Sequence, residues 1–247
     1  MAIGNHAIDL ATYAQSGALK DILPTAATIF AEPALNAFAA QPWSTRRAVR
    51  SHLQKDLRSG NIPTNSLIPL SSVQTHLPMR IGGYSDFYTS LEHCQNCSAG
   101  MARSNIFKNW FYAPSVYNSR VSSVVPTGTE VRRPVNVYFE GGVDGTPRVG
   151  ASRLLDFELE MGYFVSEGVA MGERMEIGDA KEHIFGELEV AQRISDGLVL
   201  SSDCELIGVI GFVLLNDWSA RDHQLFEMVR LPHLYLLHTS PLTPSLP

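Results

Sequence analysis

The stretch "RLLDFELEMGYF", Arg153 to Phe164, decides the fold of the second part of the chain, because it alternates strictly as a β-strand does. Asp156, Glu158 and Glu160 occupy every second position, and apolar residues stand between them. One face of the predicted strand is therefore apolar, and the other carries three negative charges. Like charges stacked on one strand face are unfavourable, so either water or a cation must compensate them.

The sequence on both sides of this stretch predicts further strands. "SSVVPTG" (122–128) and "RRPVNVYFEGG" (132–142) are typical of short strands joined by turns that contain proline and glycine. "FVLLND" (212–217) is another apolar strand that ends in an acid. These strands predict a β-rich region in this part of the chain.

The N-terminal part has a different pattern. From residue 32 to about residue 58, apolar residues recur at intervals of three and four, which predicts a helix. "SGNIPTNS" (59–66) ends this pattern and has the composition of a linker. The sequence therefore predicts a mixed, β-rich α+β fold with a small N-terminal part and a larger part dominated by strands.

The overall composition excludes several classes of protein. With 247 residues, 45% of them hydrophobic and 18% charged, the chain is long enough for one or two globular domains. Its net charge of −6 argues against a nucleic-acid binder. The longest apolar run, "LIGVIGFVLL" (206–215), is too short to span a membrane. Three cysteines do not suggest a secreted disulfide framework, so we expect a cytoplasmic protein without a membrane partner.

The carboxylates are the first candidates for chemistry. The strand pattern alone favours a solvated acidic face, because half-exposed strands are common. Asp217, however, ends an apolar run and is expected to be buried, where a charge needs a partner or a metal ion. Asp86 in "GYSDFY" adds another carboxylate. Ca²⁺ and Mg²⁺ prefer such oxygen ligands.

A histidine provides a candidate base. His93 follows Asp86 closely in the chain, and histidine is the usual general base near neutral pH, although a single histidine is more often structural. "HCQNC" (93–97) contains two cysteines, and the third is the distant Cys204. A zinc or redox site would need more ligands at suitable spacing, so we reject both.

Arginine and glutamine follow the last predicted strand. In "NDWSARDHQ" (216–224), Arg221 and Gln224 could hold a carboxylate or stabilise an oxyanion. The alternative is the start of a helix capped by Asp217 or Ser219. The two interpretations are compatible.

Four stretches together resemble the fumarylacetoacetase family, whose reaction ends tyrosine and phenylalanine breakdown. They are "IGGYSDFYTSLEH", "SSVVPTGTEVRRP", "LLDFELEMGYFV" with "KEHIFG", and "LLNDWSARDHQ". "AIGNHAIDL" and "EPALNAFAA" are similar to the start of the family's first domain. The resemblance covers roughly residues 1–186 and 212–227.

The resemblance implies two domains and a homodimer. An SH3-like N-terminal domain with a helix would occupy residues 1–74. A truncated β-roll catalytic domain would occupy residues 75–230, with residues 187–211 as an atypical insert and residues 231–247 as an aberrant tail.

The resemblance also implies a metal-assisted hydrolysis of 4-fumarylacetoacetate, a diketo acid, to fumarate and acetoacetate. The implied ligands of Ca²⁺ or Mg²⁺ are Asp86, Glu158, Glu160 and Asp217, and Asp156 is expected to be solvated or to act as a cap. His93 matches the base that activates water, and Arg221 and Gln224 match groups at the substrate and its oxyanion. The implied substrate contacts are Tyr88, Arg103 and Tyr117.

Departures from the family leave two alternatives open. One is a relative that acts on acylpyruvates or other β-diketo acids, and the other is an inactive fragment. Residues 187–211 and 231–247 have no family counterpart, and "VYNSR" (116–120) lacks two family glycines. We expect the remainder of the site, including the glutamate that orients the histidine, to be missing, and the chain as written to be poorly folded or inactive.

A retained intron would explain residues 187–211, and read-through into non-coding sequence would explain residues 231–247. Peptides that span Gly186–Glu187 and cover residues 231–247 in the native protein would refute this hypothesis.

Overall fold

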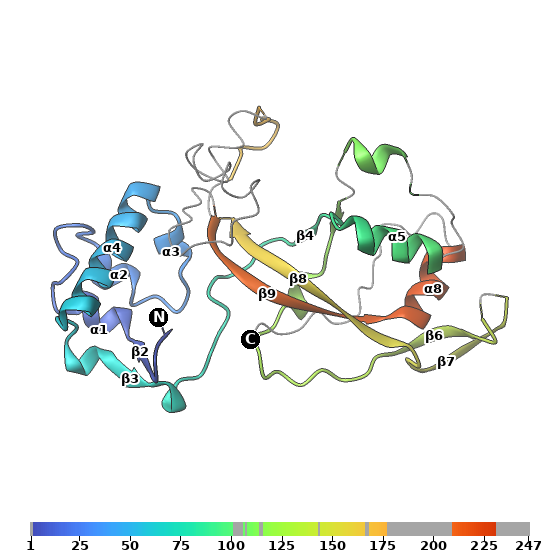
Figure 1. Ribbon diagram of the computed structural model, residues 1–247, viewed down its shortest axis with the longest axis horizontal. Coiled ribbons are helices and arrows are strands. Elements are labelled where there is room, and N and C mark those ends of the chain that lie inside the picture. Colours follow the sequence, from blue (N-terminus) through green and yellow to red (C-terminus); the bar gives the residue numbers. More distant parts are fainter. Residues whose placement is uncertain are drawn as a thin grey trace. The chain divides into compact units, whose positions relative to one another are not determined.

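A computed structural model describes residues 2–100, 106, 108–113, 116–142, 144–165, 168–176 and 209–230. Helices and small sheets are mixed along this part of the chain, which confirms an α+β fold (Figure 1). Two compact units divide it, one of residues 1–80 and 161–214 and the other of residues 81–160 and 215–247. Among the described residues, no helix combines the length and the apolar character needed to cross a membrane.

The first unit joins a small sheet to a group of helices. Its sheet has the order β1 (Ala2–Ile3), β2 (His6–Ile8) and β3 (Leu67–Pro69), with antiparallel neighbours. Its helices are α1 (Leu10–Gln15), α2 (Ala26–Ile29), α3 (Asn36–Ala39) and α4 (Trp43–Ser59). The buried core includes Ile8, Tyr13, Leu19, Phe30, Val49 and Leu53.

The single helix predicted for residues 32–58 is wrong, because the structure has two helices there. α3 ends at Ala39, and Pro42, which lacks an N–H and cannot continue a helix, precedes α4. The backbone N–H groups of Thr45 and Arg46 donate to the Pro42 carbonyl at 3.0 and 3.1 Å. α4 then ends at Gly60, whose left-handed φ of 69° favours glycine.

Residues 59–66, predicted as a linker, contribute side chains to the core of the first unit. Ile62 is 8% exposed and belongs to the core, and Ser66 is fully buried in the short 3₁₀ helix η1 (Thr64–Ser66). The N–H of Asp9 donates to the Ser66 carbonyl at 2.8 Å. This segment therefore packs against the beginning of the chain.

In its described residues, the second unit contains short hairpins and the helices α5 and α8. β4 (Ser85–Asp86) pairs antiparallel with β5 (Tyr117–Asn118), and β6 (Val135–Glu140) pairs antiparallel with β7 (Thr146–Ala151). The helices are α5 (Leu91–Gly100) and α8 (Arg221–Arg230). Three short 3₁₀ helices occur outside these elements: η2 (Leu70–Ser72) in the first unit, and η3 (Lys108–Phe111) and η4 (Val121–Ser123) in the second.

The two long strands β8 (Leu155–Val165) and β9 (Val209–Ala220) pair with each other (Figure 1). β8 confirms the strand predicted from the alternating acids. β9 confirms the strand predicted for residues 212–217, but it begins at Val209, inside the segment regarded as an insert. Residues 187–208 and 231–247 lie outside the described residues.

Two sequence predictions in this unit need correction. Residues 122–128 do not form a strand, because the chain turns at Pro126, whose carbonyl accepts from the N–H of Thr129 at 3.3 Å. A helix does begin after β9, but its first residue is Arg221. Neither Asp217 nor Ser219 therefore stands directly before it as a cap.

The two faces of β8 differ from the simplest expectation. Glu158 and Glu160 are partly buried, whereas Phe157 and Leu159 on the other face are 55% and 73% exposed. The acidic face is therefore the inward face of the strand.

Candidate metal centre

Three carboxylates from three strands meet in the second unit. Asp86 of β4, Glu160 of β8 and Asp217 of β9 each place an oxygen within 4.8 Å of the others. Glu160 comes from the inward face of β8, and Asp217 is only 4% exposed. Carboxylate oxygens grouped in this way are the ligands that Ca²⁺ and Mg²⁺ prefer.

Burial and mutual repulsion raise the pKa values of two of the three carboxylates, Glu160 and Asp217. Burial, followed by the nearby charges of Asp86 and Asp217, raises the pKa of Glu160 to about 8. Burial, followed by Glu158 and Asp86, raises the pKa of Asp217 to about 7. The Oδ1 atom of Asp217 is buried and has no hydrogen-bond partner among the described residues. A cation bound here would compensate this charge.

Tyrosines surround Asp86. The Tyr117 hydroxyl donates to Asp86 Oδ2 at 2.6 Å, and the Tyr88 N–H donates to Asp86 Oδ1 at 3.1 Å. The Tyr84 hydroxyl is buried without a partner among the described residues, and burial together with the carboxylate charges raises its pKa. Sequence reasoning missed Tyr84, which directly precedes β4 and lies two residues before Asp86.

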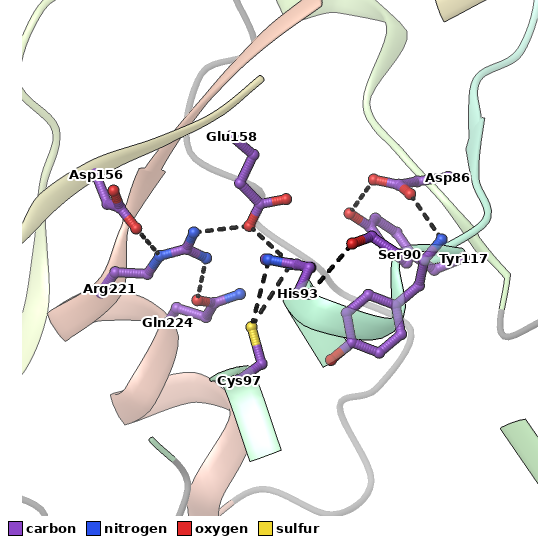
Figure 2. A network of polar contacts seen from close by, with 10 residues as sticks. Asp86, Ser90, His93, Cys97, Tyr117, Asp156, Glu158, Arg221 and Gln224 are labelled. Atoms are coloured by element: carbon purple, nitrogen blue, oxygen red, sulfur yellow. Dashed lines mark hydrogen bonds and ion pairs between the residues drawn. The ribbon is translucent and has the colours of Figure 1, made fainter. Parts of the chain in front are cut away.

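Glu158 lies outside the group of three carboxylates. Its Oε1 accepts from Arg221 Nη2 at 2.7 Å and lies 3.4 Å from His93 Nε2 (Figure 2). Of the four ligands implied by the resemblance, the structure thus brings three together, and the fourth contacts the candidate base and Arg221.

His93 lies on α5, where three further groups contact it besides Glu158. Its N–H donates to Ser90 Oγ at 3.2 Å, and its ring meets the Tyr88 ring edge-on with centroids 5.4 Å apart. Cys97 Sγ lies 3.5 Å from His93 Nε2. Burial raises the pKa of the Cys97 thiol, which favours its neutral form. Sequence reasoning did not connect Cys97 with the base, but a spacing of four on a helix would have indicated the contact.

The start of α8 is fixed by its backbone and by Asp222. The N–H of Arg221 donates to the Leu154 carbonyl at 2.8 Å. The buried Asp222 carboxylate accepts from Ser152 Oγ at 2.6 Å and from the N–H of Arg153 at 2.7 Å. These bonds hold the first turn of α8 against the segment between β7 and β8.

The guanidinium of Arg221 has three partners. Nε donates to Asp156 Oδ2 at 2.9 Å, Nη1 donates to Gln224 Oε1 at 3.1 Å, and Nη2 donates to Glu158 (Figure 2). Burial raises the pKa of Asp156, but the bond and charge of Arg221 and the N–H of Phe157 together outweigh it, so the pKa lies below its usual value. Asp156 is exposed, as expected, but it pairs with Arg221 instead of capping.

The other residues predicted to contact the substrate lie either at Asp86 or at Arg221. Tyr88 and Tyr117 lie at Asp86, and Gln224 lies at Arg221. Arg103 lies outside the described residues, so its role stays a prediction. The arrangement offers a place for a cation, a histidine beside a carboxylate, and an arginine held by acids.

Comparisons with known proteins support the resemblance. Residues 1–78 match the family model described as Fumarylacetoacetase N-terminal. Over 94% of this chain, the sequence is 32% identical to a fumarylacetoacetase of Oryza sativa subsp. japonica and 34% identical to those of Bos taurus and Homo sapiens. It covers 50% of the first and 51% of the other two, so the chain spans about half the length of the curated relatives it matches. The predicted resemblance is confirmed in this sense: the chain is similar in sequence to about half of a fumarylacetoacetase.

Proposed function

We propose that this chain carries the metal- and base-bearing part of a hydrolase that cleaves a carbon–carbon bond of 4-fumarylacetoacetate to give fumarate and acetoacetate. The names of the relatives supply the reaction. The grouping of Asp86, Glu160 and Asp217 next to the Glu158–His93 contact is the observation that carries the proposal.

The residues fit a hard divalent cation, Ca²⁺ or Mg²⁺. Asp86, Glu160 and Asp217 would hold it, and the unpartnered Oδ1 of Asp217 supports this assignment. Such an ion, when bound, polarises carbonyl oxygens and stabilises developing negative charge. The contacts of Glu158 with Arg221 and His93 both use Oε1, so its other oxygen, Oε2, could join as a fourth ligand.

His93 would act as the general base on water. With Nε2–H directed to Glu158, Nδ1, which lies 3.9 Å from Cys97 Sγ, would accept the proton of the attacking water. The negative Glu158 would stabilise the imidazolium that forms. Arg221, Gln224, Tyr88, Tyr117 and Arg103 would contact the diketo acid, as the resemblance implies.

The finer details of the fold and assembly belong to the same proposal. Residues 1–74 would form an SH3-like domain, which the family match over residues 1–78 supports. Residues 75–230 would form part of a β-roll, with a homodimer in the cytosol as the working assembly.

A chain that binds metal without catalysis is the second candidate. The guanidinium of Arg221 already donates to Asp156, Gln224 and Glu158, so it must release a partner before it contacts a substrate. Groups at an active site act as a unit, and losing one affects the rest strongly.

Hydrolysis of fumarylacetoacetate by the purified chain, with and without a chelator, tests the proposal. The proposed hydrolysis predicts turnover that stops with chelator and returns with Ca²⁺ or Mg²⁺, whereas an inactive chain, the expectation from the sequence, predicts no turnover under either condition. His93→Asn should lower kcat by about 10²–10⁴-fold, and the matched control His52→Asn in the first unit should leave it unchanged. Calcium binding without turnover would establish the second candidate instead.

A further inference from the structure

Tyr88 has an unusual backbone conformation. Among the described residues, it is the only one other than glycine with a positive φ, at 48°. An L-residue with a large side chain rarely adopts this left-handed region. Such a conformation persists where the surrounding structure fixes it, and it is found most often at functional sites.

Hydrogen bonds fix the backbone on both sides of Tyr88. Its N–H donates to Asp86 Oδ1 at 3.1 Å, and its carbonyl accepts from the indole Nε1 of Trp110 at 3.0 Å. Trp110 lies in η3, 22 residues further along the chain, and is partly buried. One bond therefore connects Tyr88 to the carboxylate cluster, and the other connects it to a distant segment.

The conformation of Tyr88 affects two groups of the candidate site. Its ring meets His93 edge-on at an interplanar angle of 81°. Its N–H satisfies one oxygen of Asp86, while Tyr117 satisfies the other (Figure 2 shows the pair Asp86 and Tyr117). If the backbone relaxed to a negative φ, the ring would leave His93 and the N–H would leave Asp86.

We propose that Trp110 is a positioning residue of this site, whose indole N–H holds Tyr88 in the left-handed conformation and thereby orients both Asp86 and His93. The motifs that point to the candidate site do not include Trp110, and it touches neither the carboxylate cluster nor the histidine in any contact described above. The inference rests on the proposed function only for its metal-binding readout.

A double-mutant cycle with Tyr88 tests this role. Trp110→Phe removes the indole donor and keeps an aromatic ring. Tyr88→Gly removes the strain, because glycine adopts a positive φ readily. The set comprises the wild type, both single variants, the double variant, and Tyr112→Phe as a neighbouring control whose side chain is 79% exposed.

Two readouts separate positioning from a general loss of structure. The first is modification of histidines by diethylpyrocarbonate in the metal-free protein, followed by mass spectrometry. His223 is 5% exposed and reports whether the unit stays folded. The second is the affinity for Ca²⁺ measured by calorimetry.

We expect the effect of Trp110→Phe to depend on whether Tyr88 is present. In the wild-type background, Trp110→Phe should raise the modification rate of His93 several-fold, leave His223 protected and weaken Ca²⁺ binding about tenfold. In the Tyr88→Gly background, the same change should alter each quantity less than twofold. Tyr112→Phe should change neither.

Equal effects of Trp110→Phe in both backgrounds, or none in the wild type, would overturn the inference. A simultaneous rise in His223 modification would show unfolding, and would overturn it as well. If no variant binds Ca²⁺, the proposed metal site fails, while the histidine modification still decides the role of Trp110.

Discussion

Asp217 is an acid that folding removes almost entirely from water, since 4% of it is exposed and one of its oxygens has no partner among the described residues. Its pKa is raised to about 7 because burial and the nearby carboxylates disfavour the charged form when no counterion is present. The properties of single residues thus connect the fold to the proposed metal chemistry.

Replacing Asp217 by asparagine should stabilise the metal-free protein. A neutral amide of the same shape avoids the buried charge and its repulsion with Glu160. At pH 8 and with chelator, we expect the free energy of unfolding in urea to rise by about 1–3 kcal/mol. The exposed control Glu173→Gln should change it little, and a destabilised Asp217→Asn protein would contradict this interpretation.

The raised pKa values also predict how the metal-free protein responds to pH. The folded state holds protons on Glu160 and Asp217 up to about pH 8 and about pH 7, whereas the unfolded chain releases them near pH 4.5 and 3.8. The stability that these groups contribute is therefore fully present below about pH 4, falls as the pH rises above the unfolded-state pKa values, and is lost once the pH has passed through about 7–8. Thermal unfolding with chelator should show a Tm that falls between about pH 4 and about pH 8, and Ca²⁺ should abolish the fall. A Tm that is unchanged or rises would contradict it.

Strands and helix breaks that depend on the local sequence pattern could be predicted from the sequence. The alternation of residues 153–164 sufficed for β8, and the apolar run before Asp217 sufficed for β9. The break between α3 and α4 was also readable, because Pro42 stands in the middle of the helical pattern. The inward direction of the acidic face was not, since it depends on which elements pack against the strand.

Contacts between distant segments account for the parts of the site that were missed. Arg221 pairs with Asp156, 65 residues away, and Tyr88 depends on a bond from Trp110. Tyrosine has no intrinsic preference for a positive φ, so no local signal predicts this conformation. Cys97 beside His93, by contrast, follows from helical spacing alone.

A substitution at Asp222 measures how much its hydrogen bonds to the segment before β8 stabilise the position of α8. Its buried carboxylate accepts two hydrogen bonds from the segment before β8. Asp222→Ala leaves both donors unsatisfied, and we expect the free energy of unfolding to fall by about 2–3 kcal/mol in urea. The exposed control Glu130→Ala should cost less than about 0.5 kcal/mol. A cost for Asp222→Ala as small as that of the control would show that these bonds do not anchor the helix.

At the scale of the whole molecule, the described residues leave apolar side chains in water. Phe157 and Leu159 on β8 are more than half exposed, next to the acidic face that is turned inward. Exposed apolar strand faces promote association.

Substituting these residues should improve the behaviour of the chain in solution. Phe157→Ser with Leu159→Ser removes apolar surface without touching the carboxylates on the opposite face, so we expect less aggregation in light scattering and unchanged Ca²⁺ affinity. Val149→Ser on β7, 76% exposed, is the matched single-site control and should have a smaller effect. Equal aggregation of the double variant and the wild type would contradict the prediction.

Calcium titration by calorimetry decides whether Asp86, Glu160 and Asp217 hold a cation. We expect one Ca²⁺ per chain, with affinity reduced at least about 100-fold in Asp86→Asn, Glu160→Gln and Asp217→Asn, and unchanged in the surface control Glu173→Gln. The absence of binding by the wild-type chain, or equal affinity in the three variants, would contradict it.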